Sequence, residues 1–323
     1  MNNLRKIGLS ALAGSLATFS VNAADVTVSG GASLSFDDTD RGGDTDTGTR
    51  GNGFYMGDSL GFNMSGETEN GLGVAVYYEI DGGALDDYDM TVSGDWGSIK
   101  FNGSGSSSAF GAVDDVTPNA YEESWDIIDD DGTATSGSPN VIGGGGGANM
   151  FIYTSPSVGG ATFTAAYQND GGAAAVEESY SDFAIAISPE MVEGLSLGYA
   201  SSDNQVGVAV DNKKTTMYAT YAIGALTFGA QSSDSDHTTA NSDMESIAYG
   251  VTYAVNDNLS IGYNEHSVDY ELSSKPDQDS SGVSASYTMG GVTLGGAMNK
   301  TDNIQGTSTR DNEGYEFTLS FAF

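Results

Sequence analysis

Apolar and polar side chains alternate along the end of the chain. The apolar positions are Tyr315, Phe317, Leu319, Phe321 and Phe323, and glutamate, threonine, serine and alanine stand between them. Successive side chains of a β-strand point to opposite faces. The pattern therefore predicts a terminal strand with one wholly apolar face and one polar or small face.

The same alternation recurs along the chain and predicts sixteen strands. They are expected at 25–36, 55–66, 72–81, 87–94, 97–103, 149–155, 161–169, 180–187, 194–201, 214–223, 225–233, 246–255, 258–267, 281–289, 291–300 and 312–323. Tyrosines that include Tyr199, Tyr249 and Tyr263 fall on the apolar face. Such amphipathic rings collect where hydrocarbon meets lipid headgroups.

The connections between these strands alternate in length. Short ones, such as Asp95-Trp96 and Asn256-Asp257, follow even-numbered strands. Long ones follow odd-numbered strands, with 82–86 as the exception. Short periplasmic turns and long extracellular loops are typical of transmembrane barrels, whereas a soluble sandwich has no reason to sort loops in this way. We therefore predict an all-β fold, an antiparallel transmembrane β-barrel of about 16 strands over 24–323, with 104–148 as an inserted loop.

The first residues have the pattern of a signal peptide. Arg5 and Lys6 precede an apolar stretch from Ile7 to Phe19, and Val21-Asn22-Ala23 supplies small residues for cleavage. This predicts a Sec signal peptide over 1–23, cut after Ala23. A membrane anchor is the alternative, but the apolar run is shorter than the roughly 20 residues that span a bilayer. Export and the barrel together predict the outer membrane of the cell.

Composition removes several classes of function. The chain has no cysteine, which excludes disulfides, zinc-thiolate sites and a cysteine nucleophile. Its 45 acidic residues outnumber 10 basic ones, for a net charge of −35. Nucleic acid is not an expected partner, because phosphate binding requires clustered lysine and arginine.

At this point the chain resembles the Gram-negative general diffusion porins, particularly those of alphaproteobacteria. The resemblance rests on the post-signal strand Val26-Thr27-Val28-Ser29-Gly30, the terminal Phe323 and the long insertion after the fifth strand. It implies a sixteen-stranded homotrimer, with loop three folded into each barrel as a constriction. It also implies that the barrel assembly machinery reads the last strand. The expected surroundings are outer-membrane lipid and lipopolysaccharide, with small hydrophilic solutes and ions passing through.

The insertion 104–148 carries the candidate pore residues. Its carboxylates include Asp114, Asp115, Glu122, Glu123 and Asp126. If the loop bends inward, these groups attract cations at the narrowest point; the alternative is a solvated external loop. Thr117 followed by Pro118 also predicts a short helix over about 118–127.

One lysine is the candidate cation of the wall. Porins of the resembling family place basic residues opposite the acidic loop, and this chain departs from that arrangement. Lys100 lies between the outward Ile99 and Phe101 and should therefore point into the lumen, whereas the other basic residues fall in or beside predicted loops. The expected function is a passive water-filled channel that prefers cations.

Other sites and functions have weaker support. Asp129, Asp130 and Asp131 are dense enough in carboxylate to suit Ca²⁺, without matching an EF-hand loop, and no other cofactor is expected. The two histidines, His237 and His266, have no nucleophile motif nearby, so they are expected to be exposed and the chain is not expected to be an enzyme.

Two alternatives to a general channel stay open. In a substrate-specific channel, lumen aromatics such as Tyr77 and Tyr218 would stack sugars, although the sequence shows no ordered track. A non-conducting surface barrel or adhesin would share the strands and lack the pore.

Overall fold

The structure is a computed structural model that describes residues 25–42, 53–125, 142, 147–169, 179–206 and 210–323. It contains sixteen strands, and each overlaps one that the sequence predicts. Their bounds are β1 Asp25–Gly42, β2 Tyr55–Glu67, β3 Gly73–Asp81, β4 Ala84–Gly94, β5 Gly97–Ser104, β6 Met150–Thr154, β7 Ala161–Gln168, β8 Tyr180–Ile187, β9 Leu195–Val206, β10 Val210–Ile223, β11 Leu226–His237, β12 Met244–Asn256, β13 Leu259–Tyr270, β14 Gln278–Met289, β15 Val292–Asp302 and β16 Asp311–Ala322.

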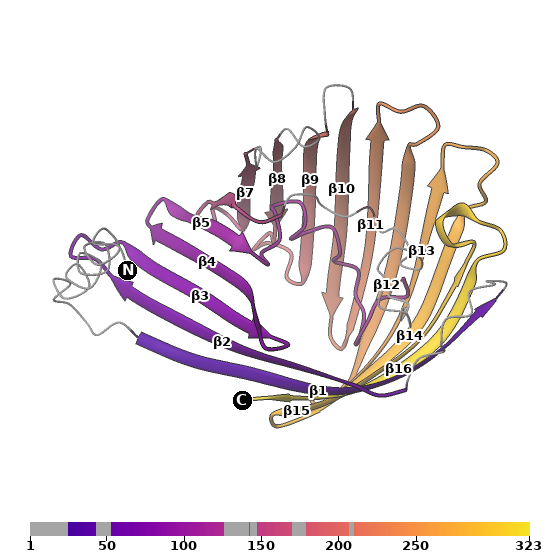
Figure 1. The fold of residues 1–323 in the computed structure, drawn as a ribbon, viewed down its shortest axis with the longest axis horizontal. Helices are drawn as coiled ribbons and strands as arrows, with labels where there is room; N and C mark the ends of the chain where they lie inside the picture. Colours follow the sequence, from indigo (N-terminus) through magenta and orange to yellow (C-terminus); the bar gives the residue numbers. More distant parts are fainter. Residues whose placement is uncertain (1–24, 43–52, 126–141, 143–146, 170–178, 207–209) are drawn as a thin grey trace, which may run out of the picture.

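The strands form one closed antiparallel barrel, which confirms the predicted fold (Figure 1). Each strand pairs with its neighbours in sequence, and β1 also pairs with β16. Closure leaves no strand edge with unpaired amide and carbonyl groups. A barrel in hydrocarbon requires this, because lipid offers those groups no partner.

The seam between the first and last strands ends on the terminal phenylalanine. The amide of Gly30 donates to the carbonyl of Phe323 at 2.8 Å, and the amide of Phe323 donates back to Gly30 at 3.0 Å. A Cβ atom on Gly30 would lie only 2.8 Å from Cε2 of the Phe323 ring. Glycine at this position therefore lets the ring lie directly on the first strand.

The two faces of the wall have opposite character. Large apolar side chains are exposed on the outside, whereas polar side chains such as Asn264, Gln278 and Glu316 are buried on the inside. This inverts the usual distribution in a soluble protein and fits a barrel whose outer face meets lipid. The predicted outward tyrosines are confirmed for Tyr199, Tyr249 and other strand positions.

Several strands extend beyond their predicted ends on the side of the long loops. β1 runs to Gly42 instead of 36, and β9 and β10 continue until only 207–209 separates them. These extensions are rich in aspartate, serine, asparagine and threonine. They lack the apolar alternation that marks a strand in contact with lipid, so the sequence pattern stops before the hydrogen-bonded ladder does.

The described residues contain one helical element, the 3-10 turn Ile304–Gly306 before β16. No helix in this part of the chain is long and apolar enough to cross a membrane. The predicted signal peptide, 1–23, lies outside the described residues.

The seam supplies a test of barrel closure. Gly30→Leu would force a side chain into the Phe323 ring, and overpacking of this kind costs about 1–3 kcal/mol. We expect a lower yield of folded, heat-modifiable barrel on electrophoresis. Gly66→Leu in β2 is the matched control, because nothing lies within 4 Å of a Cβ at that position. Equal yields from the two variants would contradict this account of the seam.

Candidate functional site

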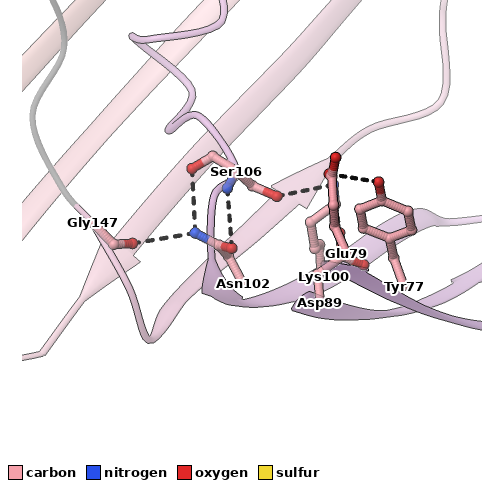
Figure 2. A network of polar contacts seen from close by, with 7 residues as sticks. All are labelled: Tyr77, Glu79, Asp89, Lys100, Asn102, Ser106 and Gly147. Atoms are coloured by element: carbon pink, nitrogen blue, oxygen red, sulfur yellow. Dashed lines mark hydrogen bonds and ion pairs between the residues drawn. The ribbon is translucent and has the colours of Figure 1, made fainter. Parts of the chain in front are cut away.

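The segment that follows β5 turns into the barrel and crosses its interior toward β12 and β13 (Figure 1). Asn102, at the end of β5, holds both ends of this loop (Figure 2). Its amide nitrogen donates to the carbonyls of Ser106 and Gly147, each at 3.2 Å, and its side-chain oxygen accepts from the amide of Ser106. One fully buried side chain thus fixes where the loop leaves the wall and where it returns.

A buried carboxylate on β8 binds the loop just after this point. Asp182 accepts from the amide of Phe110 at 2.7 Å and from the amide of Ala109 at 3.3 Å. The hydroxyl of Tyr180 also donates to Asp182, at 2.8 Å. Three donors therefore converge on one carboxylate, and bonds to a charged acceptor are the stronger kind.

An apolar cluster surrounds this anchor on the inner side of the wall. Its members are Ala109, Phe110 and Val113 from the loop, and Met150, Ile152, Ala166, Tyr180, Ala184 and Ala200 from β6 to β9. Tyr218 packs against the cluster from β10. Ala166, Ala184 and Ala200 are small inward-facing residues, and they leave space on the inner face for the loop.

A glutamine on β11 binds the next part of the loop through its main chain. Gln231 accepts from the amide of Val116 at 3.1 Å and donates to the carbonyl of Val113 at 3.1 Å. Its amide nitrogen also donates to the hydroxyl of Thr216 at 2.8 Å. Gln231 is buried and bonded at both ends of its amide, so its orientation is fixed.

Three more wall side chains bind the main chain of 120–124. The amide of Ala120 donates to Ser284 at 3.0 Å, the amide of Ser124 donates to Asn264 at 2.8 Å, and Asn299 donates to the carbonyl of Glu123 at 2.7 Å. The prediction of a helix over 118–127 is wrong for the described residues 118–125. The main-chain groups that a helix would pair with one another are bonded to the wall instead.

Glycines on the inner face let the loop approach the strands closely. A Cβ on Gly250 would lie 2.7 Å from Cγ2 of Thr117, and one on Gly262 would lie 2.8 Å from the amide nitrogen of Ala120. Real Cβ contacts are essentially never this short. A larger residue at either position would therefore push the loop toward the pore axis.

A tyrosine of the loop reaches the last strand. The hydroxyl of Tyr121 donates to Glu316, which also accepts from Thr318 at 2.8 Å and from Tyr55 at 3.1 Å. Burial of the phenol, together with the bond to this carboxylate, raises the pKa of Tyr121 well above its usual value. Tyr121 therefore stays protonated and remains a donor at physiological pH.

The described part of the loop ends against a histidine of β13. The ring of Trp125 lies 4.8 Å from that of His266, with an angle of 52° between them. The prediction of an exposed His266 is wrong, because this side chain faces the lumen but is only 3% exposed. The loop covers it, and a single sequence gives no sign of that cover.

The candidate carboxylates occupy different parts of this segment. Asp114 and Asp115 follow the apolar cluster, and Glu122 and Glu123 lie between the contacts with β16 and β13. Asp115 is exposed, and Glu123 accepts from the side chain of Asn119. Asp126 lies outside the described residues, as do Asp129, Asp130 and Asp131, the candidate calcium ligands.

Lys100 lies on the inner face of β5 among acidic groups (Figure 2). Its ammonium nitrogen is 3.4 Å from a carboxylate oxygen of Asp89 and 3.4 Å from the hydroxyl of Ser106. On the neighbouring β3, Tyr77 donates to Glu79 at 2.7 Å. The wall beside the start of the loop therefore carries more negative charge than positive charge.

Comparison with protein families identifies the fold with a known group. A family profile described as Gram-negative porin matches residues 8–303, which is most of the chain. This chain belongs to the Gram-negative porin family. With its closed barrel, it is an outer-membrane diffusion channel.

Solved structures agree on the fold of this porin. An anion-selective porin from Comamonas acidovorans has a TM-score of 0.66 at 15% identity, with 93% of this chain and 100% of that chain covered. Outer-membrane expressed OmpT of Vibrio cholerae has a TM-score of 0.66 at 14% identity, covering 94% and 99%. A mutant of the Rh. blastica porin has a TM-score of 0.62 at 16% identity, covering 93% and 100%. Comparison with curated protein sequences gave no match.

The porin has a second inward lysine, which the sequence pattern places beside a predicted loop. Because β10 begins at Val210, Lys214 lies within the strand, on the same face as the buried Thr216. Asp114 of the loop is close enough to act on its charge. The expectation of Lys100 as the one candidate wall cation is therefore incomplete. The sequence does contain a sign of this orientation. Lys213, Thr215 and Met217 alternate on the outer face, which places Lys214 on the inner face.

Metal binding by this porin stays a prediction. In the part of the chain that the structure describes, no group of three or more histidines, cysteines, aspartates or glutamates is placed to hold a metal ion. The ring nitrogen Nε2 of His237 is 3.0 Å from the hydroxyl of Ser235.

The Asp182 anchor gives a direct test of loop position. Asp182→Ala would leave the amides of Ala109 and Phe110 buried without an acceptor, at a cost of about 1–3 kcal/mol for each. We expect the loop to loosen, with noisier openings and a changed single-channel conductance in planar bilayers. Ser181→Ala, at the exposed neighbouring position, should leave both properties unchanged. Conductance and noise equal to wild type in Asp182→Ala would contradict the anchoring role.

Proposed function

We propose that this porin forms a water-filled channel for passive diffusion of small hydrophilic solutes, with a preference for cations. The observation that carries the proposal is the path of the acidic loop, which is bound to the inner faces of β8, β11 and β13 to β16. A loop on this path brings its carboxylates into the lumen. Within walls of low dielectric constant, such charges act strongly on passing ions.

The carboxylates of the wall support the same preference. Asp87 lies close enough to Asp86, Glu79, Asp81 and Asp89 for their negative charges to repel its own. These residues belong to β3 and β4, on the side of the barrel where the loop begins. Acidic groups thus line both the loop and the wall beside it.

The inward lysines do not reverse this balance. Among the side chains that the structure describes, Lys100 and Lys214 are the lysines on the inner face, and each has a carboxylate neighbour. Lys100 is near Asp89 of the wall, and Lys214 is near Asp114 of the loop. Each lysine charge is offset by its neighbouring carboxylate. The other carboxylates of the loop therefore leave the lumen with a net negative potential.

The selectivity proposal rests on the charges of this chain alone. One structural relative is described as anion-selective, but at 15% identity the likeness concerns the fold. Assembly as a homotrimer, export through residues 1–23 and the lack of enzymatic activity are part of the same proposal. Calcium binding at Asp129 to Asp131 is a separate prediction, which calorimetric titration of the purified protein would test.

Selectivity can be tested with two adjacent lysines. Lys214 faces the lumen, and Lys213 is exposed on the other face of β10. A unit charge about 4 Å from an ion changes its energy by about 1 kcal/mol in water, so Lys214→Gln should raise the cation-to-anion permeability ratio several-fold. Lys213→Gln is the control and should leave the ratio unchanged. The ratio is obtained from zero-current potentials across planar bilayers under a salt gradient.

Other outcomes would overturn the proposal. Anion selectivity of the wild type would refute the cation preference, and equal shifts in the two lysine variants would refute the assigned role of Lys214. A purified barrel that conducts no current would favour the non-conducting surface protein. Saturable block of ion current by one class of sugar would favour the substrate-specific channel.

A further inference from the structure

The described part of the pore loop ends on a buried imidazole. His266 of β13 lies under the ring of Trp125, and both side chains are almost fully buried. Neither ring nitrogen of His266 has a hydrogen-bond partner among the residues that the structure describes. Buried polar groups are nearly always paired, so an imidazole without partners at this position requires an explanation.

The loop is held less firmly at this end than at its start. At the start, Asp182 accepts hydrogen bonds from two main-chain amides of the loop and from a tyrosine. Beside Trp125, the amide of Ser124 donates to Asn264 at 2.8 Å. The hydroxyl of Ser124 and the side-chain nitrogen of Asn264 are buried without partners among the described residues. The ring contact between Trp125 and His266 is therefore an important part of the attachment.

A proton on His266 is incompatible with this burial. The imidazolium ion has two N–H donors, and both would be buried without an acceptor. Attraction between the cation and the indole face of Trp125 is smaller than the cost of burying an unpaired ion. An imidazole in water takes up a proton near about pH 6.5. Below that pH, a charged His266 is more stable when the loop has moved away.

The charges around the ring do not offset that cost. Asp279 of β14 is the residue whose charge acts on the imidazole, but its side chain is on the outer face, as is that of Glu265 on β13. The inner face of β12 carries no titratable side chain. The loop brings Glu122 and Glu123, and among the described residues neither is hydrogen-bonded to His266.

We propose that His266 is a positioning residue that holds the end of the pore loop when neutral and releases it when protonated. Docking of the loop is at full strength above about pH 6.5, and the ratio of docked to released loop falls by up to about tenfold for each pH unit below it. Strands β12 to β15 lie directly behind the segment, so a released loop moves toward the pore axis. Acid therefore narrows the passage. This effect on current rests on the proposed channel, whereas the release of the loop does not.

Trp125 itself reports on the release. The chain has two tryptophans, and the other, Trp96, is stacked on Tyr153 in a short turn between strands. Trp96→Phe leaves Trp125 as the one indole of the purified full-length barrel. Quenching of its fluorescence by acrylamide should be weak at about pH 7.5 and rise several-fold by about pH 5. Quenching that stays constant over this range would overturn the proposal.

Three further substitutions in the Trp96→Phe background separate charge from packing. His266→Phe keeps a ring under Trp125 and cannot take up a proton, so quenching should stay weak in acid. His266→Ala removes the ring, so quenching should be strong at both pH values. His237→Asn, at the other histidine of the chain, is the control and should keep the acid response. An acid response in His266→Phe equal to that of the background would overturn the proposal.

Single-channel conductance in planar bilayers gives a second readout. Wild type should conduct less at about pH 5 than at about pH 7.5, and His266→Phe should lose much of this difference. Other carboxylates titrate alike in both proteins, so the comparison isolates His266, and heat-modifiable migration confirms that the barrels stay folded. Equal acid responses of the conductance would overturn the proposal. Failure of the channel proposal would appear differently, as absence of current at neutral pH with the fluorescence response intact.

Discussion

Peptide groups in hydrocarbon must be hydrogen-bonded within the protein, and the whole architecture follows from this requirement. Sixteen strands meet it only because the first and the last also pair. The seam extends to the terminal Phe323, whose amide and carbonyl are both bonded to Gly30. Once the ladder is closed, the side chains are free to divide into an apolar outside and a polar inside.

Peptide groups inside the barrel also need hydrogen-bond partners, and there the partners are side chains. Residues 105–125, which form neither helix nor strand, cross the lumen, so their peptide groups have no ladder of their own. Asp182, Gln231, Asn264 and Asn299 supply partners from the wall. Polar residues on the inner face are therefore more than a water-compatible lining, because they determine where the loop lies and hence where its charged side chains are held.

Most of the barrel could be predicted from the sequence, because lipid contact imposes a period of two on every strand. The pattern ended too early where strands rise beyond the lipid, and for this reason Lys214 was assigned to a loop boundary. Two other predictions were wrong for another reason: the helix expected over 118–127, which is absent from the described residues 118–125, and the exposed His266. Both depend on contacts between the loop and distant strands, and a local pattern in one sequence carries no record of such contacts. The sequence was enough to identify the acidic residues of the loop, but not the strand residues that they lie beside.

The wall binds the loop mostly through main-chain groups, and main-chain groups are the same whichever amino acid is present. Substitutions at solvent-facing loop positions such as Asp115 can therefore alter the charge of the passage without moving its walls. Changes at wall positions such as Gln231 would shift the geometry and leave the charge as it is. A few amino-acid substitutions in the loop could thus change the ion preference of a related porin. The diameter of its pore would depend on different residues, those of the strands.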